Sequence, residues 1–136
     1  MSTAVDFFTA PDDPSAAAVI AAGPGRVFAT LSVGNFDAEE AVVVWECVLA
    51  GGSYDELLDA GEPRVVADDG VCVVFALSPR LSAALAAAEP QALRAAALDW
   101  SRRTAHDGRP VDADTASAVL SALTRDGGGR LYCRVA

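Results

Sequence analysis

Residues 64–77 read RVVADDGVCVVFAL, two apolar runs that flank Asp68-Asp69-Gly70. An Asp-Gly pair between two such runs is typical of a tight β-hairpin turn, because glycine adopts the positive φ angles that the turn requires. The second run, 71–77, is apolar on both sides of the predicted strand. A strand buried on both faces lies inside a sheet, so we expect this segment to be the central strand, with Cys72 in the core.

Further short strands and capped helices surround this hairpin. Strands are predicted over 5–8, 26–33 and 130–135, where apolar residues form a short run or alternate with polar ones. Helices are predicted where an Asp, Ser or Pro start signal precedes apolar residues at helical spacing, over 13–22, 38–50, 54–59, 78–88, 90–104 and 112–126. Five strands and about six helices favour one compact α+β domain over residues 1–136, with a small, mostly antiparallel sheet.

The helix predicted over 38–50 has a wide apolar face. Trp45 lies on that face, and Glu39 and Glu46, seven residues apart, share the opposite one. Glu46 is therefore expected to be solvated. The residues expected in the core are Trp45, Leu81, Leu85, Val119 and Leu120.

Composition excludes several classes of protein. The chain has 136 residues, of which 52% are hydrophobic, and a net charge of −9. A disordered chain is less hydrophobic, and a generic nucleic-acid binder is basic. All ten basic residues are arginine, which rules out lysine chemistry, and one histidine cannot build a multi-histidine metal site. The three cysteines lack C-x-x-C spacing. We therefore expect no cofactor and no metal ion, and a protein that is not an enzyme is favoured.

The same features indicate where the protein resides. The first residues lack the basic and apolar regions of a secretory signal. The longest apolar run covers residues 41–50 and is interrupted by Glu46, whereas a membrane span needs about 20 residues. An odd number of cysteines without a leader fits a reducing compartment. We expect a cytoplasmic protein that interacts with neither membrane nor nucleic acid.

One cluster of side chains is a candidate ligand site. His106 lies in a polar loop after a helix end that bears Arg102 and Arg103, with Trp100 close in sequence. Histidine titrates near neutral pH, and guanidinium groups bind anions, so an anionic small molecule would fit this loop. Tyr132, between Arg130 and Arg134 on the last strand, can contribute. A polar turn with solvated arginines, and a charged edge strand that discourages aggregation, account for the same residues.

The charge is unevenly distributed along the chain. Residues 1–70 contain 13 acidic and two basic side chains, whereas residues 71–136 contain six acidic and eight basic ones. An acidic face would attract a basic protein partner and speed its association, although an acidic surface also simply favours solubility. Our first hypothesis is a non-enzymatic interaction module, of an accessory or immunity type. The alternatives are an anionic-ligand binder or minor enzyme near Trp100–His106, and a homodimer formed through an edge strand; monomer and homodimer both stay open.

Several segments occur in an order that resembles a known family. Trp45-Glu46-Cys47 opens the series, Gly61-Glu62-Pro63-Arg64-Val65 and Leu77-Ser78-Pro79 follow, and Arg130-Leu131-Tyr132 closes it. This order resembles the YfbM-like family of uncharacterised bacterial proteins over residues 40–135, and the Leu-Tyr-Cys ending looks like that of short actinobacterial hypothetical proteins. The resemblance implies an α+β fold and a soluble bacterial protein, and it supplies no catalytic residues. The chain departs from the family at Arg64 and has a shorter segment between Leu98 and Val111.

Overall fold

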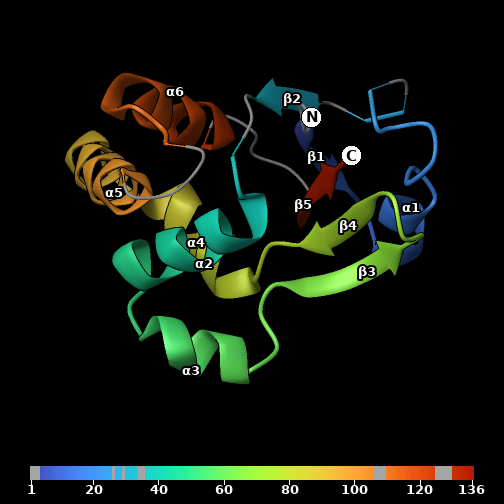
Figure 1. Cartoon of the computed structure of the whole chain (residues 1–136), viewed down its shortest axis with the longest axis horizontal. Coiled ribbons are helices and arrows are strands. Elements are labelled where there is room, and N and C mark those ends of the chain that lie inside the picture. Colours follow the sequence, from blue (N-terminus) through green and yellow to red (C-terminus); the bar gives the residue numbers. More distant parts are fainter. Residues whose placement is uncertain (1–3, 26, 29, 34–35, 106–109, 125–129) are drawn as a thin grey trace.

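The computed structural model describes residues 4–25, 27–28, 30–33, 36–105, 110–124 and 130–136. These residues form one α+β domain around a five-stranded antiparallel sheet (Figure 1). Along the sheet the strand order is β2-β1-β5-β4-β3. The strands are β1 (Val5–Ala10), β2 (Thr30–Val33), β3 (Arg64–Asp68), β4 (Val73–Ala76) and β5 (Arg130–Val135).

Five of the six helices that the structure describes begin at a side chain that accepts a hydrogen bond from the backbone N–H three residues later. Asp12, Asp37, Ser53, Ser78 and Asp112 act in this way. Such a cap satisfies one of the four N–H groups that a helix leaves unpaired at its start. The helices are α1 (Asp13–Ala17), α2 (Ala38–Leu49), α3 (Tyr54–Asp59), α4 (Pro79–Ala87), α5 (Pro90–Thr104) and α6 (Ala113–Leu123).

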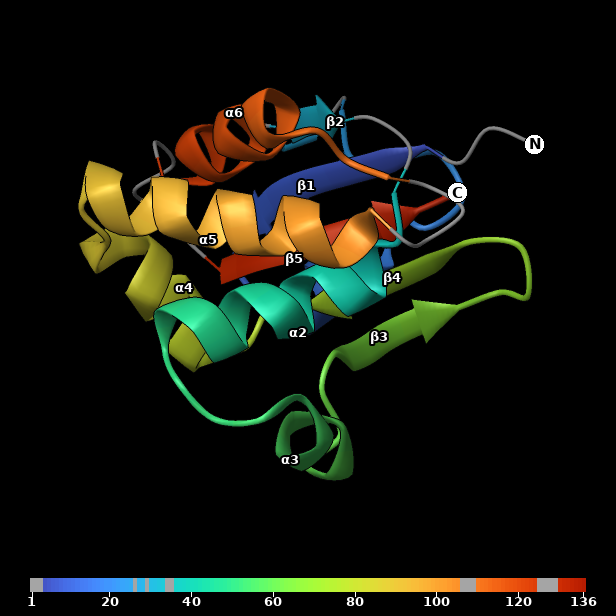
Figure 2. The same cartoon turned by 60° about the vertical axis from the view of Figure 1, so that its left-hand side comes forward.

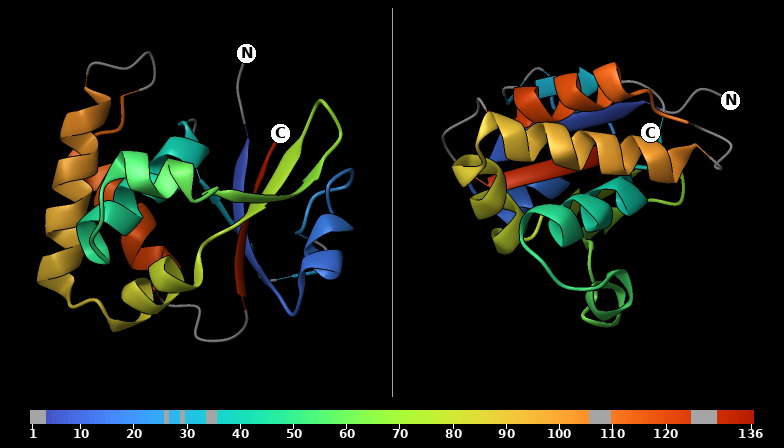
Figure 3. Two further views of the ribbon diagram at one scale, coloured as in Figure 1. Left: turned by 90° about the horizontal axis from the view of Figure 1, so that it is seen from below. Right: turned by 90° about the vertical axis from the view of Figure 1, so that its left-hand side faces the viewer.

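The sheet is covered on both faces. Four helices, α2, α4, α5 and α6, pack on one face, and α1 lies on the other (Figure 3, left). Helix α3 lies next to the start of β3, at the bottom of the view in Figure 2. Because both faces are covered, consecutive residues of β1 are buried: Phe7 points toward the four helices and Phe8 toward α1.

The larger core is built on aromatic side chains. Trp45 of α2 and Trp100 of α5 meet edge to face, with ring centroids 4.9 Å apart. Phe36 packs edge-on against Trp100 at 4.9 Å, and Phe7 lies 5.7 Å from Trp45. Edge-to-face pairs of this kind add about 0.5–1.5 kcal/mol to the burial of the rings. All five predicted core residues are buried, as expected.

The hairpin around Asp68-Asp69-Gly70 is confirmed, but the position predicted for its second strand is wrong. Strand β4 lies between β5 and β3, and the central strand is β5. The alternative of a charged edge strand over residues 130–135 is also wrong, because β5 is the central strand and Tyr132 is fully buried. Tyr132 is buried because α1 and the segment after it cover the face of the sheet that carries Tyr132 and Arg134.

Two further predictions from residue spacing are corrected. Cys72 precedes β4 and is only partly buried, with its sulfur 3.6 Å from an Arg134 nitrogen. Glu46 is 3% exposed rather than solvated. It is buried because α4 begins directly against that face of α2 and supplies polar partners for the carboxylate.

Candidate functional site

Eight of the 13 acidic residues of positions 1–70 fall in one stretch of the chain, whereas the other five lie in β1, at the start of α1 and in the β3–β4 hairpin. No basic residue occurs between positions 27 and 63, and eight acidic ones do. Of these, Glu46 is buried, and the Asp37 side chain caps α2 by accepting from the Glu40 N–H at 3.1 Å. The rest lie in the first turn of α2, on α3 and in the segment after it.

These elements enclose a groove of about 350 Å³, which we call the acidic groove. Its wall combines four carboxylates with one aromatic and two aliphatic side chains. Leu58 is 45% exposed although it is a large apolar residue. The residues that line the groove are Asp37, Glu39, Glu40, Tyr54, Leu58, Glu62 and Pro63.

The electrostatics of the groove favour a cation. Burial raises the pKa of Glu62, and the charge of Glu46 raises it further. Burial, followed by the charges of Glu40 and Asp37, also raises the pKa of Tyr54, so its hydroxyl keeps its proton. A guanidinium or ammonium group placed among these carboxylates would relieve their mutual repulsion. The groove therefore offers anionic oxygens beside an aromatic ring, which suits a basic, partly apolar peptide segment.

A buried polar cluster holds α2 and α4 together behind the acidic groove. The Ser78 hydroxyl donates a hydrogen bond to Glu46 Oε1, and its oxygen accepts from the Leu81 N–H at 3.0 Å. The Arg80 guanidinium lies 3.4 Å from Glu46 Oε2 and donates to the Ala50 carbonyl at 2.8 Å. Arg80 thus neutralises the buried carboxylate and also satisfies the C-terminal end of α2. With both carboxylate oxygens engaged, this cluster is structural.

A second polar cluster ties α1 to the sheet through Asp13. Its carboxylate accepts from Arg64 on β3 at 2.6 and 3.3 Å and from the Tyr132 hydroxyl on β5 at 2.6 Å. Arg130 lies 4.0 Å away. The hydrogen bonds from Arg64 and then from Tyr132 lower the pKa of Asp13 to about 2. Asp13 is therefore ionised at any physiological pH.

This lowered pKa predicts a pH-dependent contribution to stability. The pKa of Asp13 falls from an ordinary 3.8 to about 2 on folding, so the unfolded chain binds this proton more readily. The contribution is complete above about pH 4 and is lost as the pH falls toward 2. In Asp13→Asn we expect a lower Tm than wild type at pH 7, with the difference shrinking toward pH 2. Thermal unfolding followed by circular dichroism between pH 2 and 7 measures it.

A graded variant separates the two donors in this prediction. Tyr132→Phe removes the hydroxyl but leaves the two contacts from Arg64, so the pKa of Asp13 should rise only part of the way. Its Tm profile should then lie between those of wild type and Asp13→Asn. Parallel profiles for wild type and Asp13→Asn over the whole pH range would contradict the role of this carboxylate.

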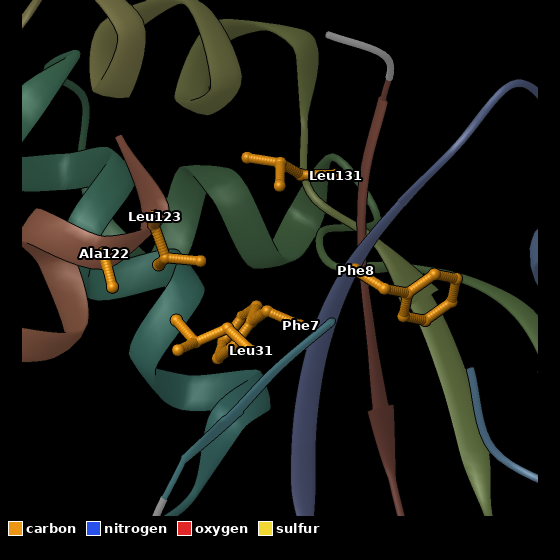
Figure 4. A pocket seen from close by; sticks show the side chains of 6 residues that line it. All are labelled: Phe7, Phe8, Leu31, Ala122, Leu123 and Leu131. Atoms are coloured by element: carbon orange, nitrogen blue, oxygen red, sulfur yellow. The ribbon is translucent and has the colours of Figure 1, made fainter. Parts of the chain in front are cut away.

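The pocket drawn in Figure 4 is too small for a ligand. It has about 10 Å³ of space between β1, β2, β5 and the end of α6. Figure 4 also shows Phe8 turned away from Phe7, on the other side of β1. A void of this size is at the lower limit for a single water molecule, and it has apolar side chains around it. It is a packing gap of the core.

The structure does not bring the five predicted ligand residues together. Trp100 is 2% exposed in the aromatic core, whereas Tyr132 is buried on the opposite face of the sheet, against α1. Arg103 pairs with Asp99 one turn earlier on α5, at 2.8 Å, and Arg102 is exposed. His106 lies outside the described residues, so its role with the two arginines stays a prediction.

The charged flanks of Tyr132 also have partners. Arg134 donates to the Ile20 carbonyl at 2.8 Å and lies 4.0 Å from Asp6. Arg130 remains exposed at the start of β5. The acidic groove was missed as a site because its two walls, the first turn of α2 and the region of α3, are separated in the sequence by the remaining turns of α2. The acidic bias of this part of the chain was nevertheless visible in the sequence.

Two features are absent from the part of the chain that the structure describes. No group of three or more His, Cys, Asp or Glu side chains in the described part of the chain is placed to hold a metal ion. Among the described helices, none has the length and apolar character needed to cross a membrane. Comparison with protein-family models, with curated proteins and with solved structures finds no match to this chain, so the resemblance to the YfbM-like family stays an expectation.

Proposed function

We propose that the protein is a non-enzymatic interaction module that docks a basic segment of a partner protein in the acidic groove. The observation that carries this proposal is the groove itself: four carboxylates from α2 and the segment after α3 line one cavity with Tyr54 and Leu58. Charge complementarity raises the rate of encounter with a basic partner, and the exposed Leu58 adds an apolar contact. An accessory or immunity-type role, in which the module sequesters that partner, fits such a surface.

The first test is binding of a nine-residue peptide of alternating arginine and leucine, measured by fluorescence anisotropy. At about 20 mM salt we expect a Kd of roughly 10 μM, typical of a small transient interface. Raising the salt to about 150 mM should weaken binding at least fivefold, because exposed charge pairs are screened. A glutamate–leucine peptide of the same length should not bind.

Variants locate the peptide on the surface. Glu39→Gln and Glu62→Gln remove one charge each from the acidic groove, and each should raise the Kd about three- to fivefold. The matched control is Asp114→Asn, which removes one exposed charge from the first turn of α6, outside the groove. If the control weakens binding as much as the groove variants do, the peptide responds to net charge alone and the proposal fails.

A further inference from the structure

A second groove, of about 430 Å³, is lined by arginine side chains where the acidic groove is lined by carboxylates. We call it the arginine groove. The sheet topology determines where this groove lies. Strands β3 and β5 both run antiparallel to β4, so both begin at the end of the sheet where β4 finishes. Two arginines 66 positions apart therefore meet there, next to the start of α4. The residues that line the groove are Arg64, Ala76, Leu77, Pro79, Ser82 and Arg130.

Asp13 holds both arginines in place but does not occupy all of their N–H donors. Asp13 takes two contacts from Arg64, at 2.6 and 3.3 Å, and lies 4.0 Å from Arg130. A guanidinium has five N–H donors, so Arg64 keeps three for another acceptor. The side chains of Arg64 and Arg130 stay 53% and 68% exposed. Two guanidinium groups against one shared carboxylate leave an excess of positive charge, in a chain whose net charge is −9.

The remaining wall of the arginine groove supplies a hydroxyl and an apolar surface. Ser82, half-buried on α4, makes no side-chain hydrogen bond with any residue that the structure describes. The exposed side chain of Pro79 offers a surface without charge, next to Ala76 and Leu77, which are buried. A volume of this order suits a small metabolite, which buries its apolar part while a few polar groups orient it.

We propose that the arginine groove binds a phosphate monoester, with the phosphate between Arg64 and Arg130 and its organic part against Leu77 and Pro79. A phosphate presents three oxygens in a tetrahedron, so it can accept from two guanidinium groups on different strands and from the Ser82 hydroxyl together. A carboxylate presents two oxygens in one plane and matches a single guanidinium fork. This site is separate from the acidic groove, and the two proposals fail or succeed independently.

The test is titration of the ¹⁵N-labelled protein with phenyl phosphate at constant ionic strength, followed through the backbone amide shifts of Ala76, Leu77 and Ser82. We expect saturation with a Kd of about 0.1–1 mM. Arg130→Gln should raise the Kd about tenfold or more, since a charge-assisted hydrogen bond is lost. This variant keeps the contacts between Arg64 and Asp13, so the fold stays intact. The matched control, Arg94→Gln on the exposed surface of α5, should leave the Kd unchanged.

Two other probes distinguish the possible ligands. Benzoate should bind at least fivefold more weakly than phenyl phosphate, and equal binding would overturn the assignment in favour of planar carboxylates. Inorganic phosphate should also bind more weakly, because it leaves the apolar wall uncovered; equal binding would overturn the assignment to a monoester. Unchanged affinity in Arg130→Gln, or shifts that sodium chloride reproduces at equal ionic strength, would remove the site altogether.

Discussion

Trp45→Ala is expected to lower the free energy of unfolding by about 3–5 kcal/mol, the range for a fully buried large aromatic residue. Trp45 has no exposed surface and touches three other aromatic rings, among them Trp100 at 4.9 Å. The surrounding helices and sheet relax only partly into the space that it leaves, so a cavity adds to the loss of buried apolar surface. Domains of this size have a total stability of about 5–15 kcal/mol, so the variant would lose a large part of it.

Urea unfolding followed by circular dichroism measures the effect, with Leu98→Ala as the control. Leu98 lies on α5 and is 42% exposed, so its truncation should lower the free energy of unfolding by about 0.5 kcal/mol or less.

Trp45→Phe is expected to give an effect between those of the two alanine variants. Among the buried side-chain nitrogen and oxygen atoms of the described residues, only Trp45 Nε1 has no hydrogen-bond partner. Phenylalanine removes that unpaired N–H and leaves a smaller cavity, so it should cost less than alanine. Equal decreases in the free energy of unfolding for Trp45→Ala and Leu98→Ala would contradict the central position of the Trp45 ring in the core.

Cys133 is expected to react with a thiol reagent at least about 1,000 times more slowly than Cys72 in the native protein. Cys133 is fully buried on the central strand, and burial raises its pKa well above the ordinary value. Only the thiolate reacts, and only when it is reached by solvent. With β1 and β4 paired on either side, exposing this sulfur requires the sheet to open. The fraction of molecules that are open is then about 10⁻³ or less.

Labelling with iodoacetamide at pH 8, followed by peptide mass spectrometry, gives the three rates separately. Cys72 is partly exposed and should react first. Burial raises the pKa of Cys47, so it should react more slowly than Cys72 but faster than Cys133. In denaturing urea the three rates should converge, which serves as the internal control. A native rate for Cys133 within tenfold of that for Cys72 would show that β5 is not the protected centre of the sheet.

The elements of the fold were predictable because their signals are local. Each of the five helix caps joins residues three positions apart, as in the hydrogen bond from the Thr115 N–H to Asp112 at 2.8 Å. The hairpin turn is equally local: Asp68 and Asp69 accept from the N–H groups of Gly70 and Val71, and Gly70 has a φ of +85°. Hydrophobic spacing within one helix also identified the core residues, Trp45 among them. Contacts between residues so close in the sequence depend on the local backbone geometry and not on residues elsewhere in the chain.

The order of the strands and the two grooves depend on contacts between distant residues. The side chains of Asp13 and Tyr132 are 119 positions apart, and those of Glu46 and Ser78 are 32 apart. Alternation on β5 correctly separates its two faces, but it leaves open whether a second layer covers the face with Tyr132 and Arg134. Arginine and tyrosine side chains suit either case, since their apolar parts can be buried while their polar ends find a partner. Local patterning therefore settled which segments became helices and strands, whereas packing of α1 and α4 against the sheet settled which charges were buried and which line the grooves.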